Sequence, residues 1–216
     1  MARGDAQVTR EKLLGAAHDL LAERATVASV SEICARAQVN VAMVRYCFGS
    51  KDGLLDALLE RVLHGLAGEL ERLLRSELAP AEQLRRHVAA VVRNYLRYPY
   101  VNRLMNERLL SADPEGVEGI ARSFALPARD AYAELLAAGR REEGWREIDP
   151  TLFFFSLVGL CEFLFSARPL LERGFGMELD PALVESFSSH VIGLLTTGLG
   201  DAPAPRARRR VARARG

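Results

Sequence analysis

Apolar residues recur along most of this chain at intervals of three and four positions, which is the spacing of one face of an α-helix. No strand-like alternation persists for long, so the pattern predicts an all-α protein. Three Asp-Pro pairs, at 113–114, 149–150 and 180–181, indicate helix starts, because the aspartate caps the helix and the proline fits its first position. We expect helices at 9–24, 30–37, 41–47, 51–77, 80–98, 100–111, 114–142 with a break near Pro127, 150–171 and 181–199.

The two shortest predicted helices follow each other near the N-terminus and are joined by a tight turn. Ser29 and Glu32 have the spacing of a capping box, which satisfies free backbone amides at a helix start. Ile33 and Ala37 lie one turn apart on a face predicted to be buried, and Asn40 is the expected N-cap of the next helix. The apolar face of that second helix is predicted to contain Val41, Val44 and Phe48. Two such helices followed by a third outline a helix-turn-helix, which predicts DNA binding.

A gap-free set of residues runs through this region: Ser29, Val30, Ile33, Cys34, Ala37, Gln38, Val39, Asn40, Ala42, Val44, Arg45, Tyr46, Cys47, Phe48, Ser50, Lys51, Asp52 and Leu54. In this order they resemble the N-terminal signature of the TetR family of bacterial transcriptional regulators. The resemblance implies an N-terminal three-helix DNA-binding domain, residues 1–54, and a larger helical ligand-binding and dimerisation domain, residues 55–200.

Three positions depart from the family pattern. Gln38 stands where the family usually has a glycine, in a turn that favours a left-handed residue. Arg45 and Cys47 occupy positions that often carry tyrosine and histidine for phosphate contact, so these two contacts are not carried over. A helical hydrophobe-binding protein with weakened or lost DNA binding therefore remains the alternative function.

Five residues are the candidates for DNA contact. Ala42 and Met43, near the start of the predicted recognition helix, are expected at base edges, and Arg45 at a phosphate or a guanine edge. Tyr46 offers a phenol to a phosphate, unless it only packs. Lys51 precedes the long helix start, where a phosphate meets both its charge and free amides; an ordinary surface lysine is the alternative.

The ligand site of the second domain is harder to predict. Aromatic residues are expected to line an apolar cavity and a few polar groups to orient the ligand. Glu162 stands inside the most apolar run, 152–165, where a buried carboxylate needs a partner, and a nearby arginine is the alternative to a ligand. The candidates are Tyr95, Asn106, Phe124, Arg129, Phe155 and Glu162.

The last two long helices carry the expected homodimer interface. The resemblance implies dimerisation there, and small residues among the phenylalanines of 150–171 permit close approach of a partner helix. The alternative is that these side chains form an intramolecular core. The interface candidates are Gly159, Phe163, Phe187, Val191 and Leu195.

Charge is unevenly distributed behind a net value of +1 over 216 residues. Residues 1–51 carry +2 and residues 202–216 carry +6, which leaves −7 for residues 52–201. The two ends can therefore engage DNA while the middle cannot. The arginine-rich tail, 201–216, has almost no apolar mass and is expected to be disordered, either as a solubilising appendage or as a sequence-independent DNA-affinity arm.

Composition and motifs exclude several classes of protein. The three cysteines lie in predicted helices with no secretory signal ahead of them, which indicates a cytoplasmic protein without disulfides. The run 152–165 is too short for a bilayer, so no membrane is expected. Hydrolase, nucleotide and zinc motifs are absent and the four histidines are scattered, presumed on the surface, so we expect no enzyme, metal or cofactor. The predicted function is a repressor released from a near-palindromic double-stranded operator by a small apolar or amphipathic effector.

Overall fold

The computed structural model describes residues 3–24, 28–111 and 114–200, and every regular element in these ranges is a helix. The arginine-rich tail, predicted to be disordered, lies outside the described residues. The N-terminal helices are α1 (Arg3–Glu23), α2 (Val30–Ala37) and α3 (Ala42–Phe48), and they are followed by the long helix α4 (Lys51–Leu74). The expected all-α fold class is therefore confirmed.

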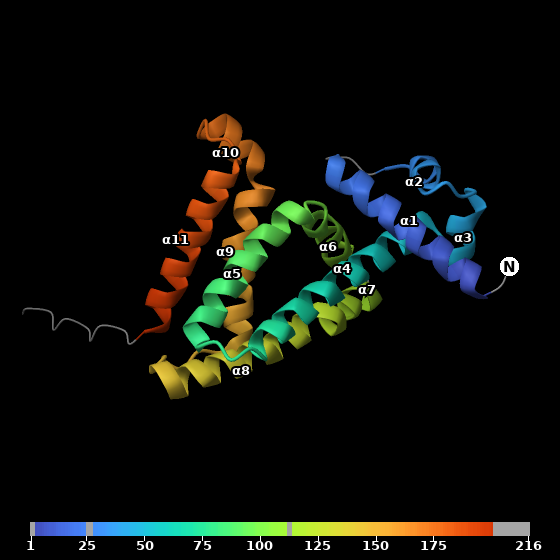
Figure 1. Ribbon diagram of the computed structural model, residues 1–216. Coiled ribbons are helices and arrows are strands. Elements are labelled where there is room, and N and C mark those ends of the chain that lie inside the picture. The colour runs from blue at the N-terminus through green and yellow to red at the C-terminus, as the bar shows by residue number, and fades with distance from the viewer. Residues whose placement is uncertain (1–2, 25–27, 112–113, 201–216) are drawn as a thin grey trace, which may run out of the picture.

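At one end of the molecule, α1 and α3 pack on the first turns of α4, and α2 packs on α1 (Figure 1). We call α1, α2, α3 and these turns the headpiece. Apolar side chains at helical spacing hold it together because each helix buries only one stripe. Its fully or nearly fully buried residues include Leu13, Leu14, Leu21, Ile33, Val44, Leu54 and Leu58. The helix α4 runs on beyond the headpiece, so the predicted domain boundary at 54 falls in its first turn.

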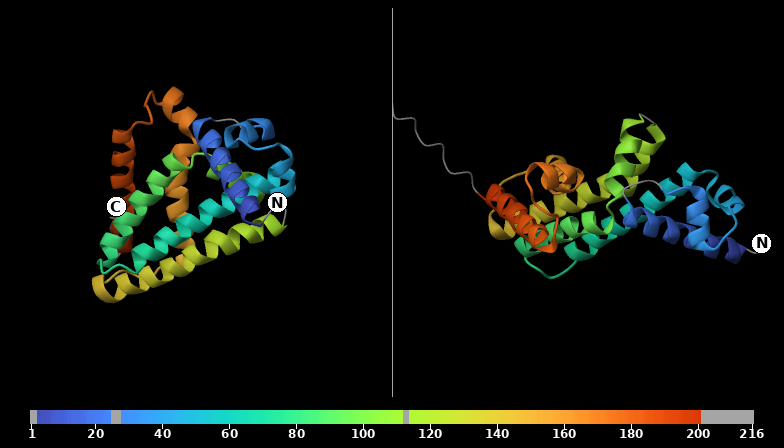
Figure 2. Two further views of the ribbon diagram at one scale, coloured as in Figure 1. Left: turned by 45° about the vertical axis from the view of Figure 1, so that its right-hand side comes forward. Right: turned by 90° about the horizontal axis from the view of Figure 1, so that it is seen from above.

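The rest of the chain forms a second bundle along α4. Its helices are α5 (Pro80–Arg97), α6 (Val101–Leu110), α7 (Pro114–Ile120), α8 (Leu126–Glu143), α9 (Pro150–Ser166), α10 (Arg168–Gly174) and α11 (Pro181–Leu199). Helices α5, α8, α9 and α11 enclose a second core that contains Leu84, Val88, Tyr132, Leu135 and Leu157. Figure 2 shows α11 at the end of the molecule opposite the headpiece.

Two predicted helices are interrupted, and a proline lies at each interruption. The predicted break near Pro127 is confirmed as a π-helical turn, Ala121–Ala125, between α7 and α8. Pro127 has no amide hydrogen and its ring crowds the carbonyl of Ser123, so the chain widens there. The single helix predicted at 150–171 is wrong, because α9 and α10 meet at a bend of 52° just before Pro169. The first helix also starts six residues earlier than expected, with Asp5 favourably placed in its first turn.

The headpiece core does not end with the headpiece. Tyr100, Val101, Leu104 and Ile120, from the α5–α6 corner, α6 and α7, are buried in the same cluster as the N-terminal helices. The ring of His18 in α1 shares a hydrogen bond with the Tyr100 hydroxyl, with 2.7 Å between Nδ1 and Oη. The headpiece is therefore packed directly against a helix of the second bundle.

No single helix within the described ranges has both the length and the apolarity to cross a membrane. Helices α9 and α10 have the necessary length and apolarity only when they are taken together, and a bend of 52° separates them.

Candidate functional site

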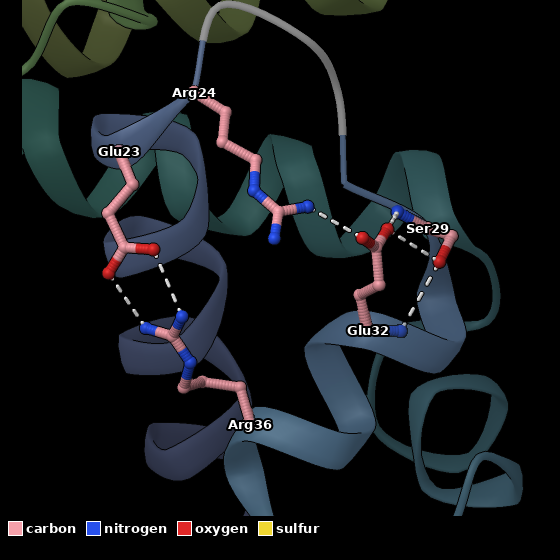
Figure 3. A network of polar contacts seen from close by, with 5 residues as sticks. All are labelled: Glu23, Arg24, Ser29, Glu32 and Arg36. Atoms are coloured by element: carbon pink, nitrogen blue, oxygen red, sulfur yellow. Dashed lines mark hydrogen bonds and ion pairs between the residues drawn. The ribbon is translucent and has the colours of Figure 1, made fainter.

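The start of α2 is held by the predicted capping box. The Ser29 hydroxyl accepts a hydrogen bond from the Glu32 amide at 3.2 Å, and the Glu32 carboxylate accepts one from the Ser29 amide at 2.8 Å (Figure 3). The Ser29 amide and hydroxyl, together with Arg24, lower the pKa of Glu32 to about 2. This carboxylate stays ionised at neutral pH, so both backbone and side-chain bonds of the box persist there.

Two ion pairs link the region of α2 to the end of α1 (Figure 3). Arg36 binds both carboxylate oxygens of Glu23, at 2.9 and 3.0 Å, and Arg24 lies 2.6 Å from a carboxylate oxygen of Glu32. All four side chains are exposed, so the pairs add little to stability. They do engage two of the headpiece arginines with carboxylates, which leaves other cations as the candidates for DNA.

The helix α3 begins at Ala42, one residue later than predicted, so its N-cap is Val41 and not the predicted Asn40. The Asn40 side-chain oxygen accepts a hydrogen bond from the Ala42 amide at 2.8 Å. Val44 is buried and Phe48 is half-buried under the Arg10 guanidinium, 5.2 Å from its ring centroid. Val41, predicted on the buried face, is 51 % exposed because it lies in the capping turn before the helix begins.

The outer surface of α3 carries most of the DNA-contact candidates. Ala42, Arg45 and Tyr46 are exposed, Tyr46 by 67 %. Met43 is half-buried against the headpiece core, so only part of its side chain faces outward. Lys51 is half-buried in the first turn of α4, where Ser50 accepts a hydrogen bond from the Gly53 amide at 3.0 Å. Among the described residues none forms an ion pair or hydrogen bond with the Arg45 or Lys51 side chain.

The second bundle encloses a cavity of about 100 Å³ between α4, α5, α6, α8 and α9, which we call the central cavity. Of the predicted ligand residues, Tyr95 and Phe124 line it. Asn106, Arg129 and Phe155 do not, which corrects the expectation that they share its wall. Asn106 is exposed, Arg129 points to Asp130 with a hydrogen bond of 2.9 Å, and Phe155 is 67 % exposed on α9.

Glu162 lies just outside the central cavity and is half-buried. Its carboxylate accepts a hydrogen bond of 3.3 Å from the side chain of Asn102, which does line the cavity. The alternative of an arginine partner finds no support in the described residues, where an amide of α6 donates to this carboxylate instead.

A histidine that was not selected from the sequence lies in the cavity wall. His87 is 7 % exposed and shares a hydrogen bond of 2.7 Å with the hydroxyl of Tyr132. Burial lowers the pKa of His87 to about 4, so its ring is uncharged at neutral pH. The expectation of scattered surface histidines is wrong here, and the available signal was the position of His87 beside Leu84 and Val88 on the buried face of α5. Glu69, Asn94 and Asn102 also line the cavity and were not selected from the sequence.

The helices α9 and α11 leave an apolar face uncovered in the single chain. On α9, Leu152, Phe155 and Phe163 are 65–67 % exposed, and a Cβ placed on Gly159 between them meets no atom within 4 Å. We call this surface, which Leu194 of α11 extends, the α9–α11 face. Large apolar side chains gathered on a surface in this way are typical of an interface.

The interface candidates on α11 differ in how far they are buried within the chain. Val191 is 1 % exposed and belongs to the second core, because this side of α11 packs on α5. It cannot touch a partner without unpacking the chain, so the prediction that it contacts one is corrected. Phe187 and Leu195 are half-buried against the same core, with Phe187 edge-on to Phe165 at 6.5 Å between ring centroids.

Both halves of the chain match profiles of one protein family. Residues 13–58 match the profile described as bacterial regulatory proteins, tetR family, and residues 77–205 match that of the tetracyclin repressor-like C-terminal domain. The chain belongs to the TetR family. It is a helix-turn-helix transcriptional regulator, and the first of these matches contains α2, α3 and the start of α4.

Curated TetR-family relatives support this assignment. The HTH-type transcriptional repressor NicS of Pseudomonas putida is 29 % identical over 175 residues, which cover 79 % of this chain and 82 % of NicS. An HTH-type transcriptional repressor of Mycobacterium tuberculosis, Rv3405c, is 36 % identical over 155 residues, 65 % of this chain and 73 % of the relative.

Solved structures share the fold. The regulator FadR from Bacillus subtilis, in complex with stearoyl-CoA, superposes with a TM-score of 0.67 and 16 % identity over 87 % of this chain and 98 % of FadR. AibR, in complex with isovaleryl coenzyme A and operator DNA, gives 0.62 and 20 % identity over 86 % and 97 %. At these identities the likeness concerns the fold alone.

The turn between α2 and α3 of the helix-turn-helix is strained at Gln38. Its backbone is left-handed, with φ 54° and ψ 44°, as the helix end requires. Replacing Gln38 with glycine is expected to raise the free energy of unfolding by about 1 kcal/mol, because glycine adopts this conformation without a Cβ clash. Urea denaturation measures the change. Gln38→Ala keeps the Cβ and is the control; an equal gain from alanine would contradict the backbone explanation.

Arg45 tests whether α3 reads bases in this family member. If its guanidinium binds a guanine edge, Arg45→Ala should cost about 1–3 kcal/mol and relax specificity at one base-pair position in each half-site. Affinities for a set of single-base operator variants would show this pattern. A uniform loss over all variants would assign Arg45 to a phosphate instead.

Proposed function

We propose that this TetR-family regulator is a repressor that binds a near-palindromic operator as a homodimer and releases it when a small molecule occupies the central cavity. One observation carries the proposal. The cavity and the headpiece core share residues, since Leu63 and Val101 line the cavity and are buried in the headpiece core. A ligand that displaces these residues acts directly on the packing of the DNA-reading unit.

DNA binding is supported by the exposed candidates on α3 and by the start of α4. Arg45, Tyr46 and Ala42 share the outer surface of one short helix, and Lys51 follows at the next helix start. A single helix of this length contacts only a few base pairs, so selection of one operator sequence needs two recognition helices. Two readers related by a two-fold axis require a near-palindrome.

Dimerisation is supported by the α9–α11 face. Phe155, Gly159 and Phe163 repeat at four-residue spacing along the exposed side of α9. An isologous contact between two such faces would cover these rings and leave the headpieces free. Of the predicted interface residues, Gly159 and Phe163 fit this contact directly, and Phe187 and Leu195 lie beneath it.

Ligand response is supported by the cavity and by what similar proteins hold. The central cavity is mostly apolar, as small-molecule sites usually are. AibR was crystallised with isovaleryl coenzyme A and operator DNA. FadR was crystallised with stearoyl-CoA. A regulator of this kind acts in the cytoplasm, where its DNA lies.

Selection of bound sequences from random DNA duplexes tests the proposal. We expect a near-palindrome with half-sites separated by one helical turn, about 34–36 Å, or a multiple of it. A chain with no sequence preference and no salt-dependent retention on DNA would favour the alternative, a hydrophobe-binding protein that has lost DNA binding.

Lys51 is expected to contact phosphate and not a base. Lys51→Ala should weaken DNA binding evenly across sequences and lower the slope of log affinity against log salt by about one unit. Titrations at several salt concentrations measure both effects. Unchanged affinity and slope would remove Lys51 from the interface.

A further inference from the structure

The polar groups of the central cavity lie at two depths. His87 and Tyr132 are buried and hydrogen-bonded to each other, and we call them the floor. Glu69, Asn94 and Asn102 are half-buried, and we call them the rim. Asn94 lies seven residues beyond His87 on α5, about two turns or ~10 Å along the helix. The rest of the lining is mainly apolar and includes Leu63, Leu66, Leu70, Val91, Phe124 and Leu157. Tyr95 and Tyr98 also line the cavity and add two phenol groups.

The rim is negatively charged. The Glu69 carboxylate accepts a hydrogen bond of 3.3 Å from Asn94, and the Glu162 carboxylate accepts one of 3.3 Å from Asn102. Both lining amides therefore direct an N–H group to a carboxylate. Within the described chain no cation forms an ion pair with Glu69 or Glu162, and neither lysine nor arginine lines the cavity. Arg97 lies over the ring of Tyr98, 5.1 Å from its centroid, but is not part of the lining.

The floor adds no positive charge. Burial lowers the pKa of His87 to about 4, and it raises the pKa of the Tyr132 hydroxyl above its usual value. At neutral pH both groups are uncharged, and each satisfies the other. An anion entering the cavity would thus lose its hydration, meet the Glu69 charge and find no cation to offset either cost.

We propose that the central cavity selects an apolar molecule that carries a protonated amine, with its ammonium group beside Glu69 and its apolar body between rim and floor. Carboxylates and phosphates of the same shape are excluded. An ammonium group offers Glu69 a charge-assisted hydrogen bond that an alcohol cannot match. The inference rests on the proposed function in treating this cavity as the effector site, and the class differs from the coenzyme A thioesters held by FadR and AibR.

Probes of similar size and different charge test the proposal on the full chain without DNA. Calorimetry at pH 7 would compare benzylamine, benzyl alcohol and benzoate, and then hexylamine, hexanol and hexanoate. In each set we expect the amine to bind at least tenfold more tightly than the carboxylate, with the alcohol between them. Equal or tighter binding of either carboxylate would overturn the proposal, and so would failure of every probe to bind at millimolar concentration.

Two substitutions on α4 locate the selectivity. Glu69→Gln should lower the affinity for benzylamine about tenfold, to that of benzyl alcohol, and leave the affinity for the alcohol unchanged. The unchanged alcohol also shows that the variant is folded. Glu71→Gln, on an exposed carboxylate two residues away that pairs with Arg75, is the matched control and should change neither affinity. An amine preference that survives Glu69→Gln would overturn the assignment.

The two proposals fail in different ways. If amines bind selectively but leave operator affinity unchanged, the proposed allosteric function fails while the ligand class stands. If only carboxylates release the operator, the ligand class fails while the proposed function stands.

Discussion

Gly159→Asp is expected to convert the proposed homodimer into monomers and to lower operator affinity by on the order of 10²–10⁴-fold. Gly159 lies on α9 between Phe155 and Phe163, and there is open space beyond its Cβ position, so the substitution itself does not disturb the chain. In a dimer through the α9–α11 face, the two-fold axis would bring two carboxylates into an apolar contact without partners. The avidity of two linked readers would then be lost.

Sedimentation measures the oligomeric state, and DNA titration measures the operator affinity. Gly65→Asp is the matched control, because Gly65 is also an exposed helical glycine with no atom within 4 Å of its Cβ position. The control should remain dimeric and bind the operator normally. A Gly159→Asp protein that stays dimeric would move the interface away from α9.

Tyr100→Phe is expected to reduce the effect of a cavity ligand on operator binding severalfold. We expect a wild-type coupling of about 1–3 kcal/mol, a five- to 150-fold change in operator affinity. Tyr100 joins the headpiece to the cavity wall, since its hydroxyl is hydrogen-bonded to His18 of α1 and its ring lies edge-on to Tyr98, which lines the cavity. Removing one hydrogen bond costs about 1 kcal/mol, or about fivefold in coupling.

Calorimetry of ligand binding with and without operator measures this coupling, because linkage requires DNA to weaken ligand binding by the factor by which the ligand weakens DNA binding. Arg75→Ala is the control: Arg75 is exposed at the far end of α4 and pairs only locally with Glu71 in the described structure. A Tyr100→Phe protein with undiminished coupling would show that the signal takes another route. Equal ligand affinities with and without operator in the wild type would end the allosteric proposal.

Features set by neighbours in sequence were predictable from the residues alone. The capping box of Ser29 and Glu32 and the left-handed turn at Gln38 both depend on contacts within four positions. The same holds for the break near Pro127, where the ring conflicts with the preceding turn. The helix-turn-helix of the TetR family is built from such local signals. The helices of this motif and the family of the chain could therefore be predicted from the sequence.

The orientation of α9 was not predictable in this way. Its run from Leu152 to Phe165 is apolar on all sides, so periodicity does not distinguish the buried Phe153 and Leu157 from the exposed Phe155 and Phe163. Val191 on α11 failed as an interface residue for a related reason: an apolar stripe shows that a side chain is buried, not whether its partner belongs to the same chain.

The sequence by itself determined the helices, the reader and the family, because these follow from spacing and from contacts between near neighbours. Only the tertiary structure decided the chemistry of the cavity and its link to the reader. His87 meets Tyr132 across 45 residues, Asn102 meets Glu162 across 60, and His18 meets Tyr100 across 82. Contacts over such separations are set by how whole helices pack, and local spacing carries no record of that packing.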